Sequence, residues 1–162
     1  TADFFSDRSY WESIADQIVF TGKIDQYFDY RFGKLEYRTV SFETETLDTA
    51  NYQGNAVVNY TSDKIPYTRI IEHKHFEMFG DAVYENPRTV ISREYPTEWH
   101  DGLEPFYPVN DERNQKLYNR YAELAAGLPN VHFGGRLAEF RYYDMAPIVK
   151  QALELSKMMN YD

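Results

Sequence analysis

The sequence predicts an α+β fold in which a mainly antiparallel sheet forms a platform with helices on either side of it in the chain. Two observations support this prediction. Between Leu35 and Tyr95, apolar and polar residues alternate with period two, and Tyr, Val, Thr and Ile are frequent. Before and after this region, apolar residues recur at helical spacing instead. Strands and helices are therefore expected in separate parts of the chain.

The segments before the sheet are short. Residues 9–14 are predicted to form a helix, and the apolar run at residues 18–21 is predicted to form a strand that ends at Gly22. A second helix is expected from Ile24 to Phe32. Within the sheet region, turn-forming residues predict connections between antiparallel strands at 51–55, 63–66 and 80–87.

The remaining elements follow the sheet. A helix is predicted from Asn110 to Gly127, capped by Asn110 or Asp111, with an apolar stripe of Leu117, Tyr121, Leu124 and Ala125. A strand is expected at residues 130–133. The last helix is predicted from about Met145 to Met158 and should pack Ile148, Ala152 and Leu155 inward.

Composition limits the kind of protein. The 162 residues, 43% of them apolar and 17% aromatic, are enough for one globular domain with a core. The net charge of -9 argues against a protein that binds duplex nucleic acid. The sequence has no cysteine, so a reducing, cytoplasmic setting is the simplest interpretation. Since no apolar segment approaches the roughly 20 residues of a membrane span, we expect a soluble chain. The start at Thr1 suggests a piece of something longer.

The stretch from Val131 to Met145, VHFGGRLAEFRYYDM, is the most informative one for function. Gly134 and Gly135 allow a sharp turn and a close approach of the backbone to a bulky ligand. Arg136 then offers a cationic fork that suits phosphate oxygens. A structural strand exit with a solvated arginine explains the same residues about equally well.

The segment from Tyr67 to Phe76 is predicted to be a strand with Tyr67, Arg69, Ile71, His73 and His75 on one side. Arg69 needs a partner. An ion pair with a glutamate across the sheet is the favoured interpretation, and a phosphate clamp is the functional one. His73 and His75 could bind zinc, but no further ligands are marked, so no metal site is expected.

Other candidate residues have two interpretations each. Glu94 is expected to form a solvated ion pair with its neighbour Arg93. Tyr107, in a segment fixed by prolines, and Tyr142 and Tyr143, before Asp144, could present a phenol to a ligand or simply pack. The chain carries no evident nucleophile and base pair, no GxGxxG and no P-loop. If it is part of an enzyme, the reactive group is expected to be a cofactor.

Six segments in order along nearly the whole chain closely resemble the bacterial UDP-galactopyranose mutases, and correspond to the carboxy-terminal part of those enzymes. The segments are Phe20–Gly33, Leu35–Arg38, Tyr52–Tyr60, Tyr67–Phe76, Glu104–Asn110 and Phe133–Met145. The resemblance implies a fragment of a larger FAD-binding, Rossmann-like flavoprotein. It also implies an isomerase that interconverts UDP-galactopyranose and UDP-galactofuranose, a precursor of cell-surface glycans. In that family reduced FAD attacks the sugar through N5 and forms a covalent flavin–galactose adduct, so that the protein supplies binding and electrostatics.

The resemblance also implies roles for single residues. Arg69 would be one arm of an arginine clamp on the UDP diphosphate, and Tyr107 and Tyr142 would hydrogen-bond the same group. Asn59 would reach the substrate near the sugar. Further residues implied are Arg136 on FAD, Asp144 and Glu94 lining the flavin and galactose region, and a helix start facing the cofactor, formed by Met145, Ala146, Pro147, Ile148, Val149 and Lys150. Ala146 and Pro147 depart from the polar residues common in the family, and Pro147 removes one amide.

The same resemblance organises the chain. Residues 1–34 and 128–162 would complete the FAD-binding domain of a parent protein, residues 35–109 would form the substrate domain, and residues 110–127 would connect them. The glycine-rich dinucleotide motif, the helical uracil-binding region and the mobile lid of the family are missing, so we expect the chain alone to be inactive. A homodimeric parent is left open. The alternatives are a non-catalytic module that binds a nucleotide or glycan, and a relative of flavin amine oxidases.

Overall fold

The computed structural model describes residues 3–159, and the chain divides into two compact units. The first unit combines both ends of the chain, residues 1–37 and 107–162. The second unit is the continuous stretch 38–106. Within the described residues, none of the helices has the length and apolar content that crossing a membrane requires.

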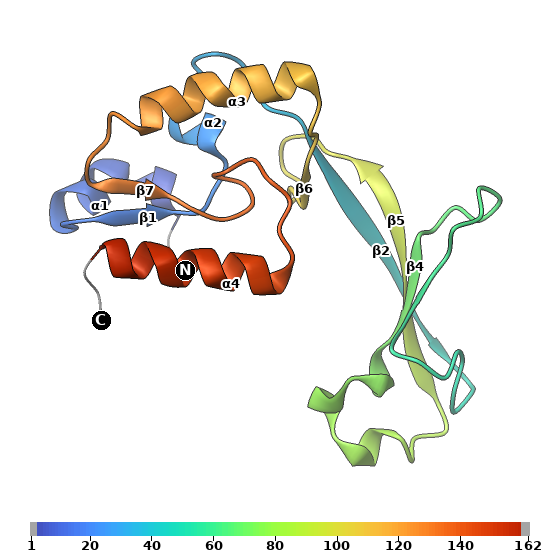
Figure 1. The fold of residues 1–162 in the computed structure, drawn as a ribbon. Helices are drawn as coiled ribbons and strands as arrows, with labels where there is room; N and C mark the ends of the chain where they lie inside the picture. The colour runs from blue at the N-terminus through green and yellow to red at the C-terminus, as the bar shows by residue number, and fades with distance from the viewer. Residues whose placement is uncertain (1–2, 160–162) are drawn as a thin grey trace. The chain divides into compact units, whose positions relative to one another are not determined.

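The first unit contains most of the helices and a small parallel sheet (Figure 1). Strands β1 (Ile18–Phe20) and β7 (Val131–Phe133) pair in parallel. The unit also holds η1 (Phe4–Ser6), α1 (Arg8–Ile14), α2 (Ile24–Tyr27), β6 (Tyr107–Pro108), α3 (Glu112–Ala125) and α4 (Met145–Met158). The predicted helical and extended segments are thus present, and α4 has the predicted bounds.

Aromatic rings form the core of the first unit. The rings of Phe20 and Tyr27 lie 4.9 Å apart, and Tyr27 contacts Phe133 at the same distance. Tyr121 of α3 is fully buried, and its hydroxyl donates to the Gly33 carbonyl and accepts from the Phe32 amide. Large rings therefore join α2, α3 and the strand pair, since each buries much apolar area.

The prediction of a helix as far as Phe32 is wrong beyond Tyr27. Asp29 and Tyr30 have positive φ angles of 53° and 54°, which end a right-handed helix. The buried Asp25 carboxylate accepts from the amides of Gln26 and Leu35 and so stabilises the chain in this reversal. Burial raises the pKa of Asp25, although these amides and Lys23 oppose the shift.

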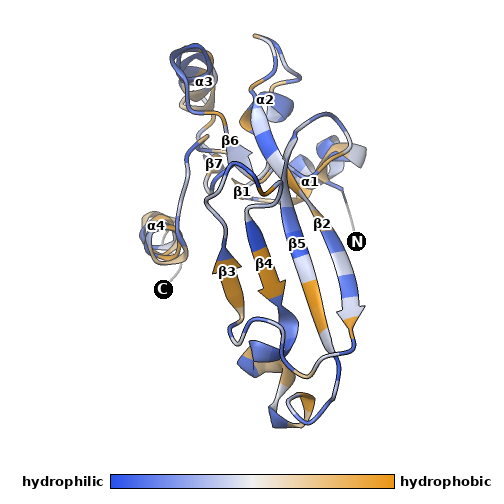
Figure 2. Cartoon of the chain, turned by 90° about the vertical axis from the view of Figure 1, so that its right-hand side faces the viewer, coloured by the Kyte–Doolittle hydropathy of each residue, from blue (hydrophilic) through white to orange (hydrophobic). Residues whose placement is uncertain are grey.

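The second unit contains the predicted antiparallel sheet. Its strands are β2 (Tyr37–Leu47, entering from the first unit), β3 (Val57–Asn59), β4 (Arg69–Glu72) and β5 (Thr89–Glu98), in the order β3-β4-β5-β2. Every neighbouring pair among these four is antiparallel. In Figure 2, β3 and the middle of β4 are hydrophobic, while β2 is mostly hydrophilic. Ile70 and Ile91 are fully buried at the centre of this sheet.

The strand predicted through Phe76 ends at Glu72. Residues 73–75 form the 3-10 turn η2, followed by η3 (Glu77–Phe79) and η4 (Asp81–Val83). His73 and His75 therefore do not share a strand face with Arg69, and this prediction is wrong. The physical reason is the buried Lys74, whose ammonium group donates to two backbone carbonyls inside the unit and draws the chain into a turn.

Candidate functional site

A row of polar side chains crosses three strands of the second unit. Asn59 on β3 lies opposite Arg69 on β4, and Arg69 lies opposite Glu94 on β5. Directly opposed residues in antiparallel strands point to the same face of the sheet. The register therefore brings together three of the residues that the sequence singled out.

Arg69 is the centre of this row. Its Nε–H donates to Asn59 Oδ1 at 2.9 Å, and its Nη1 lies 3.5 Å from Glu94 Oε2. The favoured prediction of an ion pair across the sheet is confirmed. The Arg69 side chain is 39% exposed whereas that of Glu94 is 12% exposed, so a ligand can approach the guanidinium.

The predicted ion pair between Arg93 and Glu94 is wrong. Consecutive residues of a strand point to opposite faces, so these two side chains diverge. Arg93 instead pairs with Glu45 across β2 and β5. Glu94 also accepts from the hydroxyl of Thr68, which leaves its carboxylate well supplied with donors.

A second group of candidates lies in the first unit and consists of Tyr107, Arg136, Tyr142 and Asp144. The Arg136 guanidinium carbon is 5.3 Å from the ring centroid of Tyr107 and 5.0 Å from that of Tyr142. The two rings are 6.0 Å apart. These distances are typical of cation–π contacts. Arg136 thus contacts two phenol rings and is more than a solvated strand exit.

The turn after β7 shapes this group. Gly135 has a φ of 90°, which suits glycine. The chain then folds back, so that Arg136 Nη2 donates to the Tyr143 carbonyl and the Arg141 amide donates to the Arg136 carbonyl. Phe140, buried in the same turn, has a φ of 47°. A residue of this kind in the left-handed region is strained, and the surrounding packing must hold it there.

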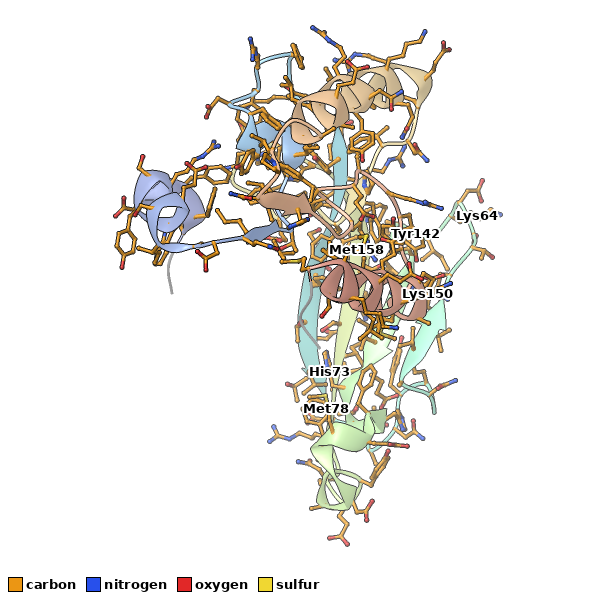
Figure 3. The ribbon with its side chains drawn as sticks, turned by 60° about the vertical axis from the view of Figure 1, so that its left-hand side comes forward. Lys64, His73, Met78, Tyr142, Lys150 and Met158 are labelled. Carbon is orange, nitrogen blue, oxygen red and sulfur yellow. The ribbon has the colours of Figure 1, made fainter. Side chains whose placement is uncertain are left out.

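Tyr142 and Asp144 form a hydrogen-bonded pair at the start of α4. The Tyr142 hydroxyl donates to Asp144 Oδ1 at 2.9 Å. This hydrogen bond and the negative charge of Asp144 raise the pKa of Tyr142, although Arg136 opposes the shift. Tyr142 therefore stays a neutral donor at physiological pH. Figure 3 labels Tyr142 together with Lys150 and Met158 of α4.

The stretch from Met145 to Lys150 does not present a single surface. Met145, Ala146, Val149 and Lys150 line a shallow groove on an exposed side of α4. Ile148 instead lines a cavity of about 380 Å³ together with residues of β1, β7 and α4. Ala152, predicted to pack inward, also lines this cavity but remains exposed. Residues 144–147, Pro147 among them, are all exposed, so the first turn of α4 is open to a ligand, whereas Ile148 is half-buried.

The structure places the candidate residues in two groups, one in each unit. The row on the sheet holds Asn59, Arg69 and Glu94, and the group around Arg136 holds Tyr107, Tyr142 and Asp144. Among residues 3–159, no three His, Cys, Asp or Glu residues gather as metal ligands. His73 instead hydrogen-bonds Ser92, and His75 contacts Glu72.

Sequence reasoning missed two charged residues in the segment that follows Arg69, Glu72 and Lys74. Both are buried, with 0% and 4% exposure. A signal was available, because alternation puts Ile70, Glu72 and Lys74 on the side of the segment opposite Arg69. Charged residues in line with a core isoleucine indicate a buried polar network.

Comparison with known proteins gives consistent results. A family model described as UDP-galactopyranose mutase matches residues 1–142. A dTDP-fucopyranose mutase of Escherichia coli is 36% identical over 141 residues, which is 87% of this chain and 36% of that protein. A UDP-galactopyranose mutase of Mycoplasma pneumoniae is 35% identical over 152 residues, 91% of this chain and 37% of its own length. A probable UDP-galactopyranose mutase of Klebsiella pneumoniae is 36% identical over 137 residues, 85% of this chain and 34% of that protein. The chain thus spans about a third of the length of these relatives.

Proposed function

The chain belongs to the UDP-galactopyranose mutase family, and on this premise we propose that it is the carboxy-terminal part of a flavin-dependent isomerase that interconverts UDP-galactopyranose and UDP-galactofuranose. In this proposal the parent protein has a Rossmann-like FAD-binding domain. Residues 1–34 and 128–162 complete that domain, and residues 35–109 form the substrate domain. The chain by itself is proposed to be inactive.

The observation that carries the proposal is the position of Arg69 between Asn59 and Glu94. A guanidinium group fixed by an amide on one side and a carboxylate on the other is oriented before any ligand arrives. Its remaining N–H groups suit the oxygens of a diphosphate. When the bond between the sugar and UDP breaks, negative charge grows on the diphosphate, and Arg69 stabilises it there.

The sugar side of the site is assigned to the neighbours of Arg69. Asn59 provides an amide that can hydrogen-bond a sugar hydroxyl, and Glu94 provides an acceptor on the same face. The Glu94 carboxylate also opposes the binding of a second anion close to it. We therefore propose that the diphosphate approaches Arg69 from the side away from Glu94.

The group around Arg136 is proposed to serve the diphosphate and the cofactor. Tyr107 and Tyr142 would hydrogen-bond the diphosphate, and for this the Tyr142 hydroxyl would turn its proton from Asp144 to the ligand. Arg136 and Asp144 would contact FAD. Each of these groups can form hydrogen bonds to a polar ligand.

The first turn of α4 fits the phosphate or ring oxygens of such a cofactor. Within the described residues, the Asp144 carboxylate makes no capping hydrogen bond to α4 and accepts from the Tyr142 hydroxyl. The amides of Met145 and Ala146 thus lie at a helix start beside an open groove. Reduced FAD, when bound, supplies the covalent chemistry through its N5.

A calorimetric titration with UDP tests the proposal. We expect saturable binding by the chain, weakened about tenfold or more in Arg69→Ala. Arg93→Ala is the matched control, since it removes the same charge from the opposite face of the same sheet. Binding that is equal in both variants would contradict the clamp. Failure of the unaltered chain to bind would contradict a clamp preformed on this sheet.

The same titration separates the competing activities. UDP and dTDP share the diphosphate but differ in the base and in the 2′-hydroxyl of the pentose, and one relative is named for a dTDP-linked sugar. Equal affinity of the chain for UDP and dTDP would mean that its site residues recognise the diphosphate alone. Binding of a glycan with no nucleotide would favour the non-catalytic module.

A further inference from the structure

Two buried charged residues at the end of β4 lie outside the proposed site. Glu72 is 0% exposed and Lys74 is 4% exposed. Burying a charge is costly unless hydrogen bonds replace its hydration. The hydrogen bonds that replace the hydration of Glu72 and Lys74 come mainly from the backbone of neighbouring loops. We therefore expect the two side chains to hold those loops in place.

Glu72 fastens the connection between β2 and β3. Its Oε1 accepts from the Tyr52 amide at 2.9 Å and its Oε2 accepts from the Gln53 amide at 2.8 Å. The Thr89 hydroxyl on β5 donates to Oε1 at 2.8 Å, and His75 Nε2 lies 3.2 Å from Oε2. One carboxylate thus joins β4, β5, the turn η2 and the loop before β3.

Lys74 fastens the same connection from its other end. Its ammonium group donates to the Ala50 carbonyl at 2.5 Å and to the Asn86 carbonyl at 3.0 Å. Ala50 lies just before the residues that Glu72 holds. Asn86 lies before β5, so Lys74 joins the segment after β2 to the segment before β5. In Figure 3, the labelled His73 marks this end of the second unit, and Lys64 marks the opposite end.

These contacts lie on the segment that leads into β3 and Asn59. Strand β3 has only three residues and one neighbouring strand, β4, so it has few contacts of its own. The backbone leading into it is held by the Glu72 amide, which donates to Ala56, and by the Gln53 side chain, which donates to the Ile70 carbonyl. A shift of this loop would move β3 along β4 and separate Asn59 from Arg69.

We propose that Glu72 is a positioning residue that sets the contact between Asn59 and Arg69 by anchoring residues 52–53, with Lys74 in support. Buried charges often add little to stability compared with apolar residues of similar volume, whereas they can specify one arrangement. The identity of the ligand that would bind at the Asn59–Arg69 contact rests on the proposed function. The positioning itself does not.

The test follows the Arg69 Nε–H group by nuclear magnetic resonance in the full chain without ligand. In Glu72→Gln, the new NH2 group faces one of the two backbone amides, so one anchor is lost. We expect the Arg69 Nε–H to exchange with solvent about tenfold faster and its signal to shift. The Ile91 amide, in the buried centre of the sheet, should keep its protection. Glu77→Gln, an exposed change of the same kind in η3, should alter neither signal.

Two results would overturn the proposal: an unchanged Arg69 Nε–H in folded Glu72→Gln, or equal acceleration at Arg69 and Ile91, which would indicate only global destabilisation. Thr89→Val removes one donor to Glu72 and carries the same test if Glu72→Gln does not fold. A UDP titration of the same samples separates the two proposals. Failure of the unaltered chain to bind UDP would count against the proposed diphosphate clamp at Arg69. The exchange rate of the Arg69 Nε–H would still test the positioning role of Glu72.

Discussion

The Tyr142 hydroxyl donates to the carboxylate of Asp144, the residue that precedes α4, at 2.9 Å. An aspartate in this position commonly caps the helix with its side chain. Here its carboxylate serves a phenol two residues earlier, and that phenol lies beside the guanidinium of Arg136. The Asp144 carboxylate thus contacts Tyr142 and leaves the first amides of α4 without a side-chain cap.

This pairing predicts how Tyr142 titrates. The carboxylate raises the pKa of Tyr142 because it disfavours a second negative charge nearby. Asp144→Asn should therefore lower the pKa of Tyr142 toward its ordinary value. Resonances of ring-labelled tyrosine followed between about pH 8 and pH 12 measure this change. Asp48→Asn, an exposed change in the second unit, is the control, and an unaltered pKa in Asp144→Asn would contradict the pairing.

Glu72 predicts a stability difference that depends on pH. Burial alone would raise its pKa, but the amides of Gln53 and Tyr52, the Thr89 hydroxyl and His75 outweigh burial and lower it. The ionised form is therefore favoured in the folded state. Its contribution is fully present above the ordinary glutamate pKa and is lost as pH falls through the lower folded value.

We expect Glu72→Gln to reduce the free energy of unfolding by about 2 kcal/mol at pH 7, and by progressively less below about pH 4.5. Urea unfolding measures the difference. A Trp11→Phe background leaves Trp99, in the second unit, as the fluorescent reporter. A difference that stays constant down to pH 3 would show that the carboxylate charge plays no part.

The core of the second unit predicts a contrast between neighbouring residues of β5. Ile91 is fully buried, whereas Val90 is 37% exposed. Ile91→Ala should cost about 2–5 kcal/mol because it leaves a cavity. Val90→Ala should cost less than about 1 kcal/mol. Urea unfolding in the same Trp11→Phe background checks both, and similar losses would mean that the strand is not packed as described.

Phe140 predicts an unusual order of two substitutions. Its ring is buried, 5.5 Å from that of Tyr37, but its backbone is left-handed. Both Phe140→Ala and Phe140→Gly should cost about 3–5 kcal/mol for the lost ring. Glycine relieves the backbone strain, so Phe140→Gly should be at least as stable as Phe140→Ala.

Thermal unfolding of the two variants, followed by circular dichroism, checks this order. Alanine is normally the more stable of the two in ordered backbone. A Phe140→Ala variant that melts clearly above Phe140→Gly would therefore contradict a left-handed backbone at this position.

Much of the fold could be predicted because its signals are local. The period of two identified the sheet, the period of 3.6 identified α3 and α4, and Asp111 caps α3 through the Asn114 amide as expected. The end of α2 could not be predicted, since it depends on a buried carboxylate that meets Leu35. The turn at residues 73–75 depends likewise on carbonyls that Lys74 reaches across the unit.

The candidate site was predictable in part. Arg69 called for a partner, and a glutamate across the sheet was expected, but the strand register that selects Glu94 was not visible in the sequence. The contact of Arg136 with two phenols depends on the fold-back after Gly135, which a turn signal alone does not specify. The role of each residue toward a ligand rests on the family resemblance and stays a prediction.

The parallel pairing of β1 with β7 affects the order in which the chain can fold during synthesis. Ile18 of β1 cannot pair with Val131 of β7 until Val131 has been synthesised. The first unit can therefore complete its fold only when most of the chain has been made. The second unit is continuous and complete once Phe106 has emerged from the ribosome. The sheet that carries Arg69 can thus fold first, while the aromatic side chains of Phe20 and Tyr27 remain without Phe133 and exposed to association with other chains.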